Sequence, residues 1–96
     1  MIRFFFFELF NYEVNIIMYI DIRSHDKYLN GHIENAKNIG MYELLLHPGM
    51  YLSKSRTYYI YCDTGFRSKM VVDKLYSIGY NCVNIEGGYN NYLIKS

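Results

Sequence analysis

Residues 57–68 read Thr57-Tyr58-Tyr59-Ile60-Tyr61-Cys62-Asp63-Thr64-Gly65-Phe66-Arg67-Ser68 and change character halfway along. The first half, Thr57 to Cys62, is rich in β-branched and aromatic residues and predicts a strand. Asp63 to Phe66 is typical of a short turn, and Arg67 to Ile78 has apolar residues at helical spacing, closed by Gly79. A strand that passes directly into a helix is the building unit of α/β domains.

The same alternation continues on both sides of this stretch. Strands are predicted at residues 16–22, 36–39 and 82–85, and helices at 24–29, 41–46 and 89–94. Breaks are predicted at 30–31, 47–49 and 86–88, and the stretch up to Ser55 is predicted to be loop or a further helical turn. Strands that alternate with helices at short intervals predict one α/β domain over residues 1–96, with a mostly parallel sheet.

Composition indicates a globular chain and argues against several partners. Hydrophobic residues make up 51% of the chain and charged residues 20%, a balance that is too apolar for disorder. The formal net charge is +1 and no long run of Lys or Arg occurs, so nucleic acid is not an expected partner. The aromatic segment from Met1 to Phe10 is too short for a membrane span and is interrupted too early for a secretory signal. It is interpreted as an N-terminal helix or strand that packs on the core.

The two cysteines, Cys62 and Cys82, lack the close spacing of metal ligands, so neither a metal nor another cofactor is expected. Both are interpreted as reduced thiols in the cytoplasm. Cys82 lies within an apolar stretch and is interpreted as a core residue, with a redox role left open. No histidine is close to Cys62 in the sequence, so a cysteine–histidine pair is not the favoured mechanism.

Cys62 lies where a predicted strand gives way to a predicted helix, a position at which open α/β sheets bind their ligands. The turn after it can direct successive backbone N–H groups inward as an anion-binding nest, and the helix adds the positive end of its dipole. Gly65 tolerates the positive φ that such a turn needs, and Arg67 adds a fixed positive charge. These features predict a thiolate whose pKa lies below the usual value of about 8.5.

A thiolate in an anion-binding turn suits two chemistries, the transfer of sulfur and the hydrolysis of phosphate esters. Four residues separate Cys62 from Arg67, whereas cysteine phosphatases have one residue more there to accommodate a tetrahedral phosphate. The smaller loop favours a single sulfur atom as the occupant. The spacing therefore makes sulfur transfer the better hypothesis without removing the other.

The segment from Cys62 to Ser68 resembles the active loop of the single-domain rhodanese-like sulfurtransferase family. Ile20 to Arg23, followed by Gly31 to Ala36, resembles the first strand of that family and its glycine–histidine turn. Ile85 to Gly88 resembles the double-glycine turn before its last helix. Four such segments occur in the right order, and the resemblance covers roughly residues 16 to 94.

This resemblance implies a three-layer domain with a five-stranded, mostly parallel sheet flanked by helices. It implies that Cys62 is the nucleophile and carries sulfur as a persulfide. The substrate-binding residues that it implies form one loop: Asp63, Thr64, Gly65, Phe66, Arg67 and Ser68. Structural support is implied for Asp21, Arg23 and His32. Tyr92 stands where the family often has tryptophan in its last helix.

The function that the sequence predicts is transfer of a sulfane sulfur by a cytoplasmic enzyme. The donor class is thiosulfate, a polysulfide or a persulfide, and the acceptor is a small thiol or cyanide. Asp63 does not favour a doubly negative donor such as thiosulfate. Two alternatives stay open, namely a sulfur-carrier or protein-interaction module of the same fold that serves a partner protein, and a cysteine phosphatase or arsenate reductase.

Overall fold

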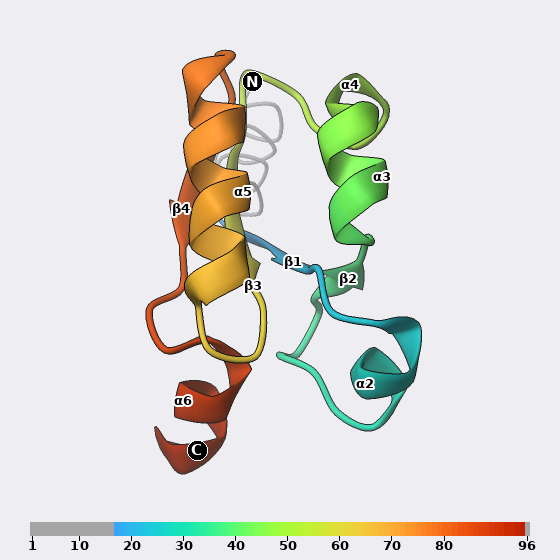
Figure 1. Ribbon diagram of the computed structural model, residues 1–96, viewed down its shortest axis with the longest axis vertical. Helices are drawn as coiled ribbons and strands as arrows, with labels where there is room; N and C mark the ends of the chain where they lie inside the picture. The colour runs from blue at the N-terminus through green and yellow to red at the C-terminus, as the bar shows by residue number, and fades with distance from the viewer. Residues whose placement is uncertain (1–16, 96) are drawn as a thin grey trace, which may run out of the picture.

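The computed structural model describes residues 17–95, in which strands and helices alternate (Figure 1). The strands are β1 (Met18–Asp21), β2 (Lys37–Asn38), β3 (Thr57–Tyr61) and β4 (Asn81–Asn84). The helices are α2 (His25–Leu29), α3 (Met41–Leu46), α4 (Pro48–Tyr51), α5 (Phe66–Ser77) and α6 (Gly88–Lys95). Apart from α4, each element overlaps one predicted from sequence. Helix α4 is one of the two alternatives left open before Ser55, a helical turn, but it begins at Pro48, within the break predicted at 47–49.

The strands form one sheet in the order β2-β1-β3-β4, and every neighbouring pair is parallel. Ile20 of β1 pairs with Ile60 of β3, and Tyr58 of β3 pairs with Cys82 of β4. In a parallel sheet all carboxyl ends meet at one edge, so the segments that follow β1, β3 and β4 lie together there. These segments carry the residues that the sequence singles out.

The sheet has four strands over residues 17–95, not the five that the resemblance implied. The expectation fails in this region because the remainder of it forms helices, turns and short connecting loops, and none of these pairs as a fifth strand. The helix or strand predicted within residues 1–10 lies outside the described residues. No helix between residues 17 and 95 has both the length and the apolar character needed to cross a membrane.

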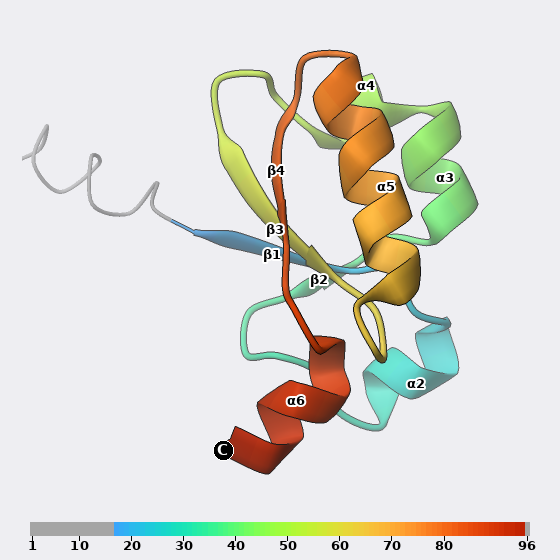
Figure 2. The same ribbon diagram turned by 60° about the vertical axis from the view of Figure 1, so that its left-hand side comes forward.

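Side chains alternate between the two faces of the sheet, and each face has its own apolar cluster. One face packs Ile20 and Ile60 against Leu44 of α3 and against Leu75 of α5, the helices beside the sheet in Figure 2. Ile60, Leu44 and Leu75 are fully buried, and burial of each contributes about 1.5–3 kcal/mol. This packing holds β3 against α5 and so sets the geometry of the turn between them.

The opposite face carries a smaller cluster centred on the fully buried Tyr61 of β3. Ile33 and Ala36, from the segment before β2, pack on it together with Tyr89 and Tyr92 of α6. The rings of Tyr89 and Tyr92 stack with their centroids 5.7 Å apart. Tyr92 therefore provides aromatic packing in the position where the family often has tryptophan.

Candidate functional site

The turn from β3 into α5 begins with Cys62 and reaches the helix at Phe66. Gly65 closes it with φ 92° and ψ −6°, in the left-handed region that favours glycine. A Cβ atom at Gly65 would lie 3.0 Å from the backbone nitrogen of Gly87 and 3.2 Å from the carbonyl oxygen of Ile85. Both the torsion angle and the close approach therefore require glycine at this position.

The start of α6 holds the other side of the turn. The N–H of Tyr89 donates to the Cys62 carbonyl at 2.8 Å, and the N–H of Asn90 donates to the Asp63 carbonyl at 3.0 Å. A Cβ atom at Gly88 would meet these same two carbonyl oxygens, so the backbones approach as closely as glycine allows. The double-glycine turn noted in the sequence thus fixes the backbone on which the thiol is carried.

The Cys62 sulfur lies among hydrogen-bond donors, and the residue is 6% exposed. Backbone N–H groups of Gly65 and Ser68 donate to Sγ at 3.2 Å and 3.4 Å, and the Ser68 hydroxyl lies 3.4 Å from it. Burial by itself raises the pKa of the Cys62 thiol, but hydrogen bonds from Ser68, Gly65 and Thr64 outweigh it and lower the pKa below its usual value. The turn therefore directs backbone N–H groups at the Cys62 sulfur.

The sequence analysis did not identify Asn84, the last residue of β4, as part of this site. Its Nδ2 donates to the Gly65 carbonyl at 3.1 Å, and its Oδ1 accepts from the Ser68 hydroxyl at 2.5 Å. The only sequence signal is its position at a strand end, directly before the turn that begins at Ile85. Its contacts join residues 16 and 19 positions apart, and no local pattern reports such contacts.

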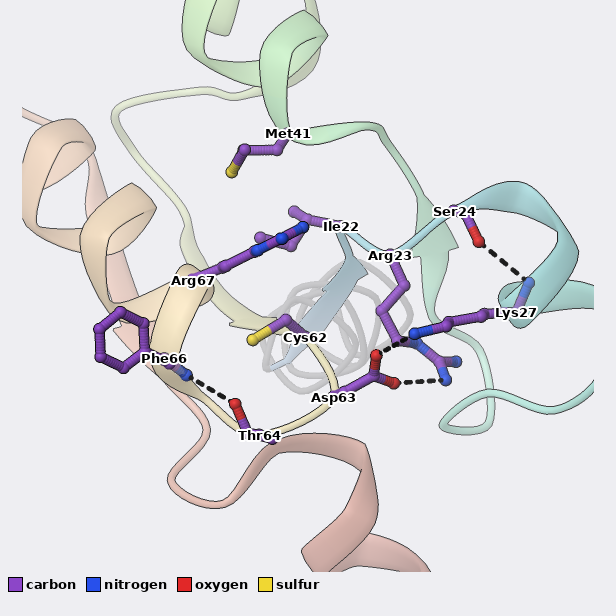
Figure 3. A pocket seen from close by; sticks show the side chains of 10 residues that line it. All are labelled: Ile22, Arg23, Ser24, Lys27, Met41, Cys62, Asp63, Thr64, Phe66 and Arg67. Carbon is purple, nitrogen blue, oxygen red and sulfur yellow. Dashed lines mark hydrogen bonds and ion pairs between the residues drawn. The ribbon is translucent and has the colours of Figure 1, made fainter.

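The sulfur faces a pocket of about 440 Å³ (Figure 3). The pocket wall consists of residues from three segments of the chain: Ile22, Arg23, Ser24, Lys27, Met41, Cys62, Asp63, Thr64, Phe66 and Arg67. Four of the six predicted loop residues line the pocket. The other two, Gly65 and Ser68, are not part of its wall and contact the sulfur through their backbone N–H groups. Ile22, Ser24, Lys27 and Met41 were not predicted, because they join the site only through the sheet order.

The loop acid Asp63 points away from the sulfur in Figure 3 and toward two cations. Lys27 of α2 binds Oδ2 of Asp63, and Arg23 lies 3.5 Å from Oδ1. Burial raises the pKa of Asp63, but the hydrogen bonds and charges of Lys27 and Arg23 outweigh it and lower that pKa. Arg67, by contrast, makes no ion pair with any residue from 17 to 95. Among the described residues the pocket therefore presents Arg67 as a cation without an ion pair, and Asp63 as an acid whose charge is compensated by Lys27 and Arg23.

The three residues predicted to give structural support differ in how they relate to the pocket. Asp21 is fully buried, and Arg23 donates to its carboxylate at 2.7 Å and to the Gly31 carbonyl at 2.7 Å. The ring of His32 stacks on Tyr28 at 3.8 Å and hydrogen-bonds its carbonyl at 2.8 Å through Nδ1. Arg23 also lines the pocket wall, whereas Asp21 and His32 do not.

Cys82 is buried in the cluster between the sheet and α5 and does not line the pocket. Burial raises the pKa of the Cys82 thiol to about 11. Both cysteines are free thiols. The part of the chain that the structure describes contains no group of three His, Cys, Asp or Glu side chains that could hold a metal ion.

Comparison with known proteins places this geometry in one family. The profile of the rhodanese-like domain matches residues 11–95. A rhodanese-related protein from Thermoplasma volcanium superposes with a TM-score of 0.78 at 27% identity, covering 90% of this chain and 85% of that one. A rhodanese-like domain protein from Staphylococcus aureus gives 0.68 at 36% identity, covering 75% and 70%.

A curated relative, the adenylyltransferase and sulfurtransferase uba4 of Ogataea parapolymorpha, is 32% identical over 74 residues. The match takes in 76% of this chain but only 19% of that relative, so this chain corresponds to a small part of it. The family profile covers most of the chain, and the solved structures share its fold. The chain belongs to the rhodanese-like domain family.

Proposed function

We propose that this chain is a sulfurtransferase that moves a sulfane sulfur from a donor to an acceptor through a persulfide on Cys62. The observation that carries the proposal is the ring of backbone N–H groups directed at the Cys62 sulfur, within a turn that opens on a pocket. Such a ring stabilises a thiolate and equally the anionic terminal sulfur of a persulfide. Belonging to the rhodanese-like family supports the same chemistry.

The reaction has two displacement steps. In the first, the Cys62 thiolate attacks the outer sulfur of the donor, a new S–S bond forms, and the donor's own bond to that sulfur breaks with its electron pair on the leaving fragment. In the second, an acceptor thiolate or cyanide attacks the terminal sulfur of the persulfide. The Cys62 S–S bond breaks and the thiolate returns, so the cycle needs no net oxidant or cofactor.

The pocket residues divide into two roles in this scheme. The N–H groups of Gly65 and Ser68 hold the sulfur of Cys62, and Arg67, which makes no ion pair with any residue from 17 to 95, offers its charge to an anionic donor or acceptor. Because Asp63 is compensated by Lys27, it does not oppose a negatively charged donor as strongly as a free carboxylate would. The free thiols of Cys62 and Cys82 suit a reducing compartment, which supports the cytoplasmic location we propose.

An intact-mass measurement tests the proposal. After incubation with thiosulfate or polysulfide, we expect the protein to gain the mass of one sulfur atom and to lose it when cyanide or a small thiol is added. Cys62→Ser should abolish the gain, and Cys82→Ser, at a buried thiol outside the pocket, should retain it.

Two results would contradict sulfur transfer. One is the absence of a persulfide with every donor, and the other is turnover of an aryl phosphate that Cys62→Ser abolishes, which would favour a phosphatase.

A protein acceptor is the second candidate. Phe66 and Met70 lie one helical turn apart at the start of α5 and are 73% and 59% exposed, and Phe66 also lines the pocket. Exposed apolar side chains at a pocket rim are suited to contact with a partner protein. If the persulfide forms but small acceptors discharge it slowly, a sulfur-carrier module is supported. Rapid discharge by small thiols, unchanged in Phe66→Ala, would contradict it.

A further inference from the structure

The Ser68 hydroxyl lies between two acceptors but has one proton to donate. Its oxygen is 3.4 Å from the Cys62 sulfur and 2.5 Å from Asn84 Oδ1. Ser68 is fully buried, so water does not offer the hydroxyl an easy alternative partner. The hydroxyl proton therefore points either to Asn84 or to Cys62.

The orientation of the Asn84 amide decides which of these two acceptors the Ser68 hydroxyl donates to in the resting state. On its far side Asn84 faces the Gly65 carbonyl at 3.1 Å, and a carbonyl only accepts hydrogen bonds. The NH₂ group must therefore face Gly65, which turns Oδ1 toward Ser68. With the Ser68 proton on Oδ1, a lone pair of the serine oxygen faces Cys62 and accepts its S–H.

Two sets of contacts thus act on the same sulfur in opposite directions. The backbone N–H groups of Gly65 and Ser68 favour a thiolate, whereas the chain from the thiol through the Ser68 hydroxyl to Asn84 is complete only while the thiol keeps its proton. When the thiol proton leaves to solvent or to an acceptor, the hydroxyl can turn and donate to the sulfur anion instead.

We propose that Asn84 is a positioning residue for Cys62: its side-chain carbonyl draws the Ser68 hydroxyl proton away from the sulfur and so favours the resting thiol over the thiolate. Deprotonation of Cys62 moves the hydroxyl from Asn84 to the sulfur, and reprotonation moves it back. An amide oxygen is too weak a base to keep the proton, so Ser68 reorients its hydroxyl and Asn84 sets the resting direction. Nothing in this inference requires that sulfur be transferred.

The test is the pH dependence of Cys62 alkylation by iodoacetamide in Asn84→Ala, Ser68→Ala and the double variant. With Ser68 present, Asn84→Ala should lower the thiol pKa by about one unit, because the hydroxyl is then free to donate to the thiolate. In the Ser68→Ala background, Asn84→Ala should not lower the Cys62 thiol pKa in this way, because no hydroxyl is left to donate to the thiolate. Cys82 does not interfere, since its pKa is about 11.

The double variant separates this role from the support that Asn84 gives to Gly65. Loss of the bond to the Gly65 carbonyl affects both backgrounds equally, whereas the effect through the hydroxyl exists only with Ser68. Equal shifts in the two backgrounds would overturn the proposal. Asn81→Ala, at an exposed asparagine of the same strand, is the matched control and should change nothing. Asn84→Leu replaces Asn84→Ala if circular dichroism shows that the smaller side chain unfolds the protein.

The outcome is independent of the proposed function. The alkylation profiles report only the protonation of Cys62, whereas the persulfide assay reports sulfur transfer. A protein that forms no persulfide but shows the predicted non-additivity would contradict the proposed function and support the role of Asn84. A protein that forms the persulfide but shows equal pKa shifts in the two backgrounds would support the proposed function and contradict the role of Asn84.

Discussion

Asp63 carries the compensated charge at the pocket rim, and its two cations come from the segment after β1. Lys27 and Arg23 bind its two carboxylate oxygens, although they lie 36 and 40 residues away in the sequence. The side chains of Lys27 and Asp63 are 58% and 35% exposed, so solvent screens most of this attraction. The pair matters more for the local charge of the pocket than for the stability of the fold.

Asp63→Asn tests this view at the scale of a residue. The folded-state pKa of Asp63 is lowered, so its contribution to stability is complete above the ordinary carboxyl pKa of about 3.9 and is lost as the pH falls through the folded-state value. We expect the variant to lose less than about 1 kcal/mol in urea unfolding at neutral pH, and the difference from wild type to shrink in acid and in high salt.

The matched control for this prediction is Asp73→Asn. Asp73 pairs with Lys69 at 3.4 Å, and both side chains are about two thirds exposed, at 66% and 64%. We expect a smaller change there than at Asp63. A loss at Asp63 that persists unchanged from neutral pH to well below the carboxyl pKa would show that charge is not its cause.

At the scale of the elements, the turn between β3 and α5 depends on contacts from a segment more than twenty residues further along the chain. The loop backbone is held by the N–H groups of Tyr89 and Asn90 and approaches the glycines of the 85–88 turn closely. Helix α5 supplies N–H groups to the sulfur, and its buried face fixes its position against β3. The anion-binding ring is therefore a product of three elements.

Gly65→Ala should disrupt this arrangement. An alanine at φ 92° is strained, and its Cβ would meet backbone atoms of Gly87 and Ile85 that cannot move as a side chain does. The left-handed strain alone predicts a loss of about 1–2 kcal/mol in unfolding free energy. Because the Gly65 N–H bonds the sulfur, the pKa of Cys62 should also rise, which thiol alkylation as a function of pH will measure.

Gly40→Ala is the control for that substitution. Gly40 has φ −61°, and nothing lies within 4 Å of a Cβ built there, so the variant should be as stable as wild type or gain up to about 1 kcal/mol. If Gly65→Ala matched Gly40→Ala in both stability and thiol pKa, the glycine at the turn would have no structural role.

For the molecule as a whole, the two faces of the sheet differ in the chemical character of the side chains that pack on them. The face covered by α3 and α5 is an apolar core, whereas the other face holds a polar centre built on Tyr61. The Tyr61 hydroxyl donates to Asp21 at 2.9 Å and accepts from the N–H of Ile33 at 3.0 Å. This single group links β3, the end of β1 and the segment before β2.

Tyr61→Phe should therefore destabilise the whole protein. Removal of the hydroxyl leaves a buried carboxylate oxygen and a buried N–H each short of one partner, which costs about 1–3 kcal/mol. Urea unfolding followed by circular dichroism will measure the loss. Tyr59→Phe is the control, because the Tyr59 ring contact with Tyr19 remains in phenylalanine. Equal effects of the two substitutions would exclude the Tyr61 network as a source of stability.

Sequence pattern predicted the α/β class, the parallel sheet, the turn at Cys62 and the need for glycine at 65, because each depends on neighbours within a few residues. The pattern predicted four strands, which is the number that the structure has over residues 17–95, whereas the family resemblance implied a sheet of five. Asp21 and Arg23, for which the resemblance implied structural support, are two residues apart along the chain and contact each other.

Only the tertiary structure brought Asn84, Lys27 and Met41 to the site. The order β2-β1-β3-β4 places β1 and β4 on either side of β3, so the segments that follow them meet at Cys62 from opposite directions. Strand order depends on how apolar faces pack at long range, and residues distant in sequence carry no local sign of it. Cys62 and its turn could thus be singled out from neighbouring residues, whereas Asn84, Lys27 and Met41 are brought to them only by the fold.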